Sequence, residues 1–255
     1  MKILSAISAI AAGAALLAFS VPAGASPDSR IEAAARESYV FRTYLKEDEI
    51  KIESREGVVT LTGTVSENSR SALAGETIAS LRGVKAVENK LTVKGEPSSS
   101  LDAWLSDKLK ISLLFHRSVN AGKAEVTVKD GVVTLRGYAS SQAQKDLTTE
   151  YAKDIDGVKE VLNEMVVTEA SKNEPRTPRQ KIDDASITGQ VRLALLLHRS
   201  TSVLSTTVAV KRGVVTVGGK AKNAAEIALV TKLVEDINGV KRVKNLMMLE
   251  AAAGN

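Results

Sequence analysis

Two histidines are the first residues in this chain that could transfer protons or bind a metal ion. His116 and His198 are the only histidines in 255 residues, and they occupy equivalent positions in two similar segments, 113–117 and 195–199. Such a pair could shuttle a proton or bridge a metal. On a helical wheel, however, each continues an apolar stripe, which in one segment consists of Leu105, Leu109 and Leu113. This pattern favours packed rings with a hydrogen-bonded nitrogen, and hence a structural role.

Other residue types that carry chemistry give no stronger signal. The chain contains no Cys, which excludes thiol nucleophiles and Cys-ligated metals. Ser and Thr are numerous, but none lies in a nucleophile elbow. The acidic residues show no paired spacing that repeats along the chain. We therefore expect neither an enzyme nor a cofactor.

A seven-residue block with two glycines occurs three times. In each copy a Gly-Val-Lys block begins 26 residues after the first glycine of the seven-residue block, while the spacing between copies varies. A constant internal step with variable spacers indicates a duplicated module. Phosphate-binding glycine loops run from a strand into a helix, whereas the first glycine here follows an X-Gly pattern typical of a hairpin turn. We assign a structural role to the nine repeated glycines, which are Gly57, Gly63, Gly83, Gly131, Gly137, Gly157, Gly213, Gly219 and Gly239.

Each copy predicts the same order of elements. A helix is followed by a strand (50–55, 124–129 or 206–211), a tight turn and a strand that ends on the second glycine. A helix with apolar residues at i, i+4 and i+8 comes next, and a last strand ends at Val93, Val167 or Leu249. The fold class is α+β, with three tandem αββαβ modules, each a small three-stranded sheet covered on one face by two helices. The order of the strands is left open.

Asparagines recur near the end of each module. Asn89, Asn163 and Asn245 share one position and face inward by strand parity. A buried amide must be hydrogen-bonded, and we expect it to bind backbone groups near the Gly-Val-Lys turn. Asn223 with Glu226 predicts a capping box for the last helix.

These motifs resemble the BON domain. The resemblance rests on the Gly-Val-Val-Thr-Leu-x-Gly block, the 26-residue step and the Gly-Val-x-x-Val-x-Asn ending, and it covers most of the chain. It implies an αββαβ fold and tandem modules in bacterial periplasmic and outer-membrane proteins, including osmotically inducible ones. It also implies an association with phospholipid or envelope surfaces. It implies no catalytic activity and few functional residues.

The organisation of the chain follows from its ends and linkers. Lys2, an apolar run and the small residues before Ser26 predict a signal peptide over 1–25, cleaved after Ala25, and a periplasmic protein; an uncleaved anchor is the alternative. The modules are predicted at 26–95, 101–169 and 183–250. A polar linker with two prolines over 170–182 predicts that the third module is the most independent.

Charge distinguishes the copies. Residues 26–95 are neutral and residues 96–170 carry a net charge of −3, whereas residues 171–255 carry 14 basic and 7 acidic side chains, a net charge of +7. Such an excess could attract anionic headgroups, or it could be an ordinary solvated surface. Nucleic acid is not expected, because the protein is exported and no aromatic residues interleave with the charges.

The first helices of copies two and three are apolar on two sides, so each needs a second partner besides its own sheet. That partner is either a neighbouring module or a membrane. Together with the basic excess, this defines the candidate residues for contact with a membrane or a partner, which are Trp104, Ile111, Phe115, Leu193, Leu197, Lys211, Arg212, Lys220, Lys222, Lys241, Arg242 and Lys244.

The sequence thus predicts a non-catalytic envelope protein whose modules bind anionic phospholipid or a membrane surface, with envelope proteins as further partners and a role in envelope or osmotic stress. One alternative is a periplasmic chaperone or protein-interaction scaffold that does not touch lipid. Another is a purely structural role, with the modules as spacers or oligomerisation units.

Overall fold

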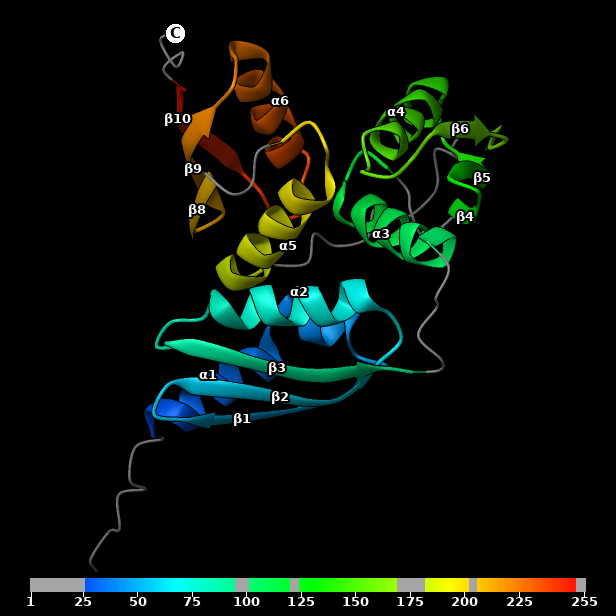
Figure 1. Ribbon diagram of the computed structural model, residues 1–255. Helices are drawn as coiled ribbons and strands as arrows, with labels where there is room; N and C mark the ends of the chain where they lie inside the picture. Colours follow the sequence, from blue (N-terminus) through cyan, green and yellow to red (C-terminus); the bar gives the residue numbers. More distant parts are fainter. Residues whose placement is uncertain (1–25, 95–100, 120–123, 169–181, 202–205, 251–255) are drawn as a thin grey trace, which may run out of the picture.

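The three repeats form three separate sheets, each with its own helices (Figure 1). The computed structural model describes residues 26–94, 101–119, 124–168, 182–201 and 206–250. The predicted signal peptide, the first linker and residues 170–181 of the second linker lie outside these described residues.

Every module contains the predicted order of elements. Module 1 consists of α1 (Pro27–Glu37), the π-helix η1 (Val40–Tyr44), β1 (Glu49–Arg55), β2 (Val58–Val65), α2 (Asn68–Ala79) and β3 (Ala86–Val93). Module 2 consists of α3 (Leu101–Phe115), β4 (Ala124–Lys129), β5 (Val132–Ala139), α4 (Gln142–Lys153), β6 (Glu160–Asn163) and the short β7 (Val166–Val167). Module 3 consists of α5 (Asp184–Leu197), β8 (Thr206–Lys211), β9 (Val214–Ala221), α6 (Ala224–Glu235) and β10 (Arg242–Leu249).

The sheets are mixed. In each module the second strand lies in the middle, antiparallel to the first strand and parallel to the last. Two helices cover one face, so the predicted α+β class is confirmed. The predicted end of the second strand is wrong, because the strand continues two residues beyond its second glycine. Gly63 shows the reason: its φ is +116°, and a Cβ there would lie 1.9 Å from the Glu49 carbonyl oxygen, so glycine lets the strand pass.

The hairpin turn explains the first glycine of the block. Glu56 and Gly57 both have positive φ, 53° and 83°, as a type I′ turn requires. The Gly57 carbonyl accepts a hydrogen bond from Lys85 N at 2.8 Å, and the other two modules repeat this bond. The hairpin turn thus lies beside the Gly-Val-Lys turn at the start of the parallel pairing. This contact accounts for the constant 26-residue step.

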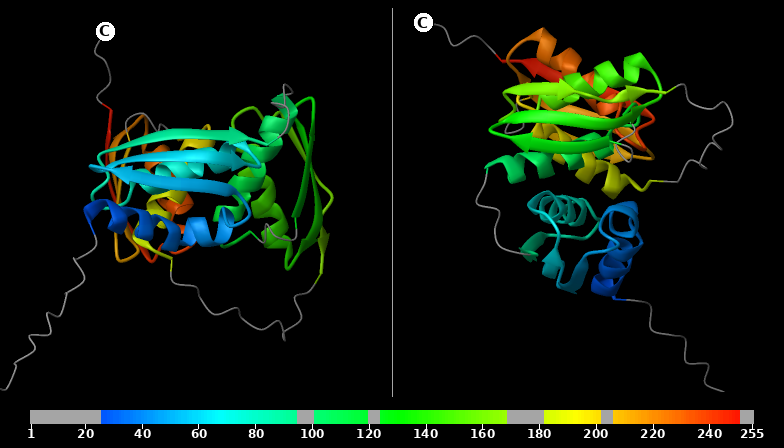
Figure 2. Two further views of the ribbon diagram at one scale, coloured as in Figure 1. Left: turned by 90° about the horizontal axis from the view of Figure 1, so that it is seen from below. Right: turned by 90° about the vertical axis from the view of Figure 1, so that its right-hand side faces the viewer.

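The helices meet in the centre of the molecule and the sheets lie outside. Figure 1 shows α2, α3 and α5 packed together, with the sheet of module 1 below, that of module 3 on the left and that of module 2 on the right. The views in Figure 2 agree, since the uncovered face of each sheet points away from the other two modules. The three open faces therefore point in three directions.

The prediction that module 3 is the most independent is wrong. Its helix α5 packs against both α2 and α3. A Cβ at Gly189 in α5 would lie 2.5 Å from Thr77 Oγ1 in α2, so the two helices approach closely where the glycine lies. Asp183 and Ser186 also accept hydrogen bonds from Tyr39 N and Val40 N of module 1, at 2.7 and 3.0 Å. Module 3 is thus held on two sides.

Candidate binding surfaces

The apolar candidates of the first helices lie between the modules. Ile111, Phe115, Leu193 and Leu197 are all at most 5% exposed. Phe115 contacts Tyr44 of module 1, with ring centroids 6.0 Å apart. These four side chains are therefore covered by protein in this arrangement, which corresponds to the neighbouring-module alternative for their partner and leaves none of the four for contact with a membrane.

Trp104 differs from these four because it remains 36% exposed. It lines a hollow of about 460 Å³ where the three modules meet, together with Leu193, Leu196 and Leu197 of α5. Lys108 Nζ lies 3.5 Å from the centre of the Trp104 ring, a cation–π contact. Burial, followed by the nearby Glu67, raises the pKa of Asp107 in the same wall to about 6.

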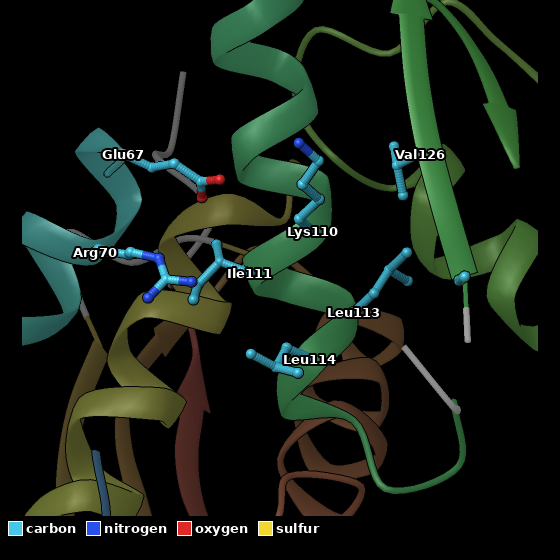
Figure 3. A pocket seen from close by; sticks show the side chains of 8 residues that line it. Glu67, Arg70, Lys110, Ile111, Leu113, Leu114 and Val126 are labelled. Carbon is cyan, nitrogen blue, oxygen red and sulfur yellow. The ribbon is translucent and has the colours of Figure 1, made fainter. Parts of the chain in front are cut away.

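A second hollow, of about 250 Å³, lies between modules 1 and 2. Figure 3 shows Arg70 and Glu67 on one side of it, with Ile111 and Leu114 of α3 pointing toward them and Lys110 on the same helix. The Arg70 guanidinium is held by the Tyr44 carbonyl and by Asp48 Oδ2 at 3.1 Å. The Arg70 guanidinium, one of the charged groups that line this hollow, is thus already bound within the protein.

The two histidines lie at the contact between modules 2 and 3, buried to 1% and 2% exposure. His198 Nδ1 lies 2.9 Å from Asp154 Oδ2, and His198 Nε2 lies 3.3 Å from Ser112 Oγ. His116 stacks on Tyr151 with ring centroids 3.9 Å apart, and its Nδ1 lies 3.5 Å from Asp236 Oδ2. The rings pack as predicted, and His198 has the predicted hydrogen-bonded nitrogen, but neither ring nitrogen of His116 has a hydrogen-bond partner within the described residues, so this part of the prediction is wrong for His116. The acidic neighbours of both rings come from the other module.

Electrostatics at this contact follow from burial and pairing. Burial lowers the pKa of His116, against the opposing influence of Asp236. Burial alone would raise the pKa of Asp154 and Asp236, yet the neighbouring histidines and hydrogen bonds from Ser118 or Ser200 hold the pKa of both carboxyl groups below the usual value. The site favours neutral His116 and ionised aspartates.

The three modules share an aspartate at one position, so the expectation that the acidic residues have no repeated spacing is wrong. Asp28, Asp102 and Asp184 begin the first helices and accept hydrogen bonds from both backbone amides of the hairpin turn; in module 1 these are Glu56 N at 2.8 Å and Gly57 N at 2.9 Å. Each aspartate lies 29 residues before the turn glycine. That constant distance is the signal that could have revealed them, and their role is structural.

The repeated asparagines are hydrogen-bonded, but not to the predicted partner. Asn245 Nδ2 donates to the Ile227 carbonyl of α6 at 3.0 Å, and its Oδ1 accepts from Met247 N at 2.9 Å. Asn89 and Asn163 do the same in their modules. The side chain faces the covering helix and not the Gly-Val-Lys turn. In the predicted capping box Asn223 Oδ1 accepts from Glu226 N at 2.8 Å, but the Glu226 carboxylate accepts from Lys222 N.

The basic candidates gather on and around the open face of module 3. Val215 and Val217 are fully buried beneath the helices, so the alternate residues of β9 face outward. Through the strand register, this open face carries Lys211, Lys220, Arg242 and Lys244, all exposed. Arg212 and Lys241 lie at the hairpin end of the same sheet, and Lys222 follows β9.

Two apolar side chains complete this surface. Leu246 and Met248 of β10 share the open face and are 63% and 68% exposed. They lie beyond Lys244 along the strand, and Met248 pairs with Lys220. No strand residue on this face is acidic, and no ion pair joins its four basic residues to a carboxylate within the described residues. We call this set of six residues the module 3 face.

The described residues do not assemble other kinds of site. Within them, no three His, Asp or Glu side chains are grouped so that they could hold a metal ion. No helix in the described part of the chain is long and apolar enough to cross a membrane. The surfaces above are therefore the candidates for function.

The three modules correspond to a known family. A family model for the BON domain matches residues 27–95, 101–169 and 183–251, which together form most of the chain. The chain belongs to the BON domain family. Its BON modules are similar to those of the osmotically-inducible protein Y of Escherichia coli (strain K12), with 32% identity over 54% of this chain and 71% of that protein.

Two further relatives carry other names. The outer membrane lipoprotein DolP of Haemophilus influenzae is 28% identical over 61% of this chain and 85% of its own length. The 21 kDa hemolysin of Actinobacillus pleuropneumoniae is 31% identical over 46% of this chain and 62% of its own length. None of these three relatives is named for an enzymatic reaction.

Proposed function

We propose that this BON-domain protein is a non-catalytic envelope protein that docks on anionic phospholipid through the module 3 face. The observation that carries the proposal is the composition of that face: four exposed basic side chains without an acidic strand residue, next to two exposed apolar side chains. Membership of the BON domain family and the similarity to an outer membrane lipoprotein support an envelope location.

Each part of the face contributes a different interaction. A Lys or Arg near an anionic membrane contributes about 1 kcal/mol, so four contribute about 4 kcal/mol, on the order of a thousandfold in affinity. Leu246 and Met248 can add apolar contact area, up to about 1.5–3 kcal/mol for each side chain that becomes fully buried. The helix residues Ile111, Phe115, Leu193 and Leu197 are buried and supply none of this area.

The arrangement of the sheets limits how the protein can lie on a membrane. The open faces point in three directions (Figures 1 and 2), so a planar bilayer contacts one face at a time. The proposal therefore requires that the module 3 face makes the contact and that the other two open faces remain in water.

Vesicle binding by the full chain tests the proposal. Phosphatidylglycerol vesicles should sediment the protein at about 0.05 M salt and release most of it at about 0.5 M, because screening shortens the range of the attraction. Phosphatidylcholine vesicles serve as the neutral control and should bind little. Equal sedimentation with both vesicles, or none with either, would reject lipid docking and favour the alternative of a protein-binding scaffold.

A further inference from the structure

The contact between modules 2 and 3 is built from the same residues on both sides. The segment His116-Arg117-Ser118 follows α3, and His198-Arg199-Ser200 follows α5. Helix α4 ends beside Asp154 and helix α6 beside Asp236. Each His-Arg-Ser segment meets the aspartate of the other module, so each module carries both halves of the contact.

The backbone repeats this reciprocity. Arg117 N donates to the Asp236 carbonyl at 2.9 Å and Asn238 N donates to the Phe115 carbonyl at 2.9 Å. The mirror pair is Arg199 N to the Asp154 carbonyl at 2.9 Å and Asp156 N to the Leu197 carbonyl at 3.2 Å. Two short antiparallel bridges result, His116 with Ile237 and Ile155 with His198. A contact in which each side offers the same patch is isologous, the type that closes symmetric dimers.

We propose that this surface also joins two copies of the chain, with module 2 of each copy docked on module 3 of the other. The same side chains and amides would be paired in the exchanged dimer as in the monomer, so exchange removes the partner of no buried group. Module 1 packs on both α3 and α5, and an exchanged pair rebuilds that docking site as well. This inference does not depend on lipid binding.

The covalent connection between the modules determines when exchange occurs. A tether of ordinary length holds two modules at an effective concentration on the order of millimolar. Pairing within one chain therefore dominates in dilute protein. Exchange becomes competitive when modules 2 and 3 of one chain separate, as in refolding, and the protein concentration approaches this effective concentration.

A disulfide trap tests the exchange, since the chain has no Cys of its own. Residues 116 and 237 form the non-hydrogen-bonded pair of their bridge, with Cα atoms expected about 4.5 Å apart, within the range that a disulfide spans. The variant His116→Cys/Ile237→Cys is refolded from denaturant at about 1 µM and at about 1 mM, then oxidised and run on a non-reducing gel. We expect the covalent dimer to increase at least tenfold at the higher concentration.

Two further variants complete the experiment. Thr127→Cys/Ile237→Cys places one thiol on the open face of module 2. When every refolded sample is diluted to about 1 µM before oxidation, so that random collisions between exposed thiols are rare, this variant should give no covalent dimer from either refolding concentration. Ile155→Cys/His198→Cys traps the mirror bridge and should reproduce the result if the first variant folds poorly. Disulfides that form only within one chain at both concentrations, in both trap variants, would overturn the proposal. Dimers that are equally abundant in the control would also overturn it.

Discussion

The open faces of modules 1 and 3 share one fold but differ in chemistry. The face of module 1 places Glu53 beside Arg55 and Glu88 beside Lys90, the latter pair at 2.7 Å, so its charges cancel locally. The module 3 face has four basic residues that form no ion pair with any carboxylate in the described part of the chain, and it adds Leu246 and Met248. The same turn glycines and turn-binding aspartates hold both sheets. The scaffold is thus conserved between the repeats, and its outer face sets what it can bind.

The open face of module 2 is intermediate between these two. It exposes Tyr138, Leu162 and Val166, but it also carries acidic residues and an ion pair between Arg136 and Glu164 at 2.8 Å. Exposed apolar area alone therefore does not distinguish module 3. The distinguishing property is apolar area next to positive charge that no carboxylate among the described residues pairs.

Reversal of charge on the module 3 face should cause the largest change in vesicle binding. The variant Lys220→Glu/Arg242→Glu/Lys244→Glu removes about 3 kcal/mol of attraction and adds repulsion, so binding to phosphatidylglycerol vesicles should fall at least about a hundredfold. Lys51→Glu/Arg55→Glu/Lys90→Glu changes the net charge equally on the module 1 face and should cost far less. Equal losses in a sedimentation assay would show that only net charge matters.

The contact between α2 and α5, which lies behind the sheets of modules 1 and 3, can be disrupted without changing either open face. Gly189→Leu inserts a side chain where a Cβ already lies 2.5 Å from Thr77 Oγ1, and it should destabilise the docking of module 1 by about 1–3 kcal/mol. Thermal unfolding should then show a separate transition for module 1. Ala33→Leu, at the matching exposed position of α1, is the control and should leave one transition. Unchanged unfolding of the Gly189 variant would contradict the close approach of the helices.

The apolar part of the module 3 face should have a smaller effect on binding. Leu246→Ser/Met248→Ser should weaken vesicle binding by about 1–2 kcal/mol, roughly tenfold, and this loss should persist at high salt because it is not electrostatic. Leu162→Ser on the module 2 face should leave binding unchanged. A loss that disappears with salt, or an equal loss in the control, would remove the apolar residues from the contact.

The smallest expected effect concerns pH. The folded protein lowers the pKa of His116, so the unfolded chain binds this proton first and stability is lost as the pH falls below about 6.5. The lowered pKa values of Asp154 and Asp236 add a further loss only near the ordinary carboxyl range. The melting temperature should drop by a few degrees between about pH 7.5 and 5.5. His116→Phe should flatten this dependence. If the variant keeps the full drop in melting temperature, a group other than His116 causes it.

The sequence predicted the module and most of its elements because glycine spacing and strand periodicity are local properties. The strands 124–129 and 206–211 begin and end as predicted. The second strand was predicted to end at Gly63 because glycine often ends a strand. Here the missing Cβ makes room for the Glu49 carbonyl, and the strand continues. Asp28 could have been found from its constant distance to Gly57.

The binding surface was harder to predict because it depends on how the modules pack. The two-sided apolar helices indicated a second partner, but only the structure shows that α3 and α5 bury Phe115 and Leu197 among the modules. Leu246 and Met248 lie in a strand whose pattern suggested nothing unusual, and they matter because no helix covers that face. The acidic partners of the two histidines come from another module, which no pattern within one repeat reveals.

The most direct test asks which open face meets the bilayer. Thr60, Thr134 and Thr216 occupy the same place in the three repeats, each on an open face. Each can be replaced singly by Cys and labelled with an environment-sensitive fluorophore in a chain that has no other thiol. With phosphatidylglycerol vesicles, only the probe at position 216 should shift to the blue. A shift at position 60 or 134 of equal or greater size, or no shift at 216 while the protein is bound, would contradict docking through the module 3 face.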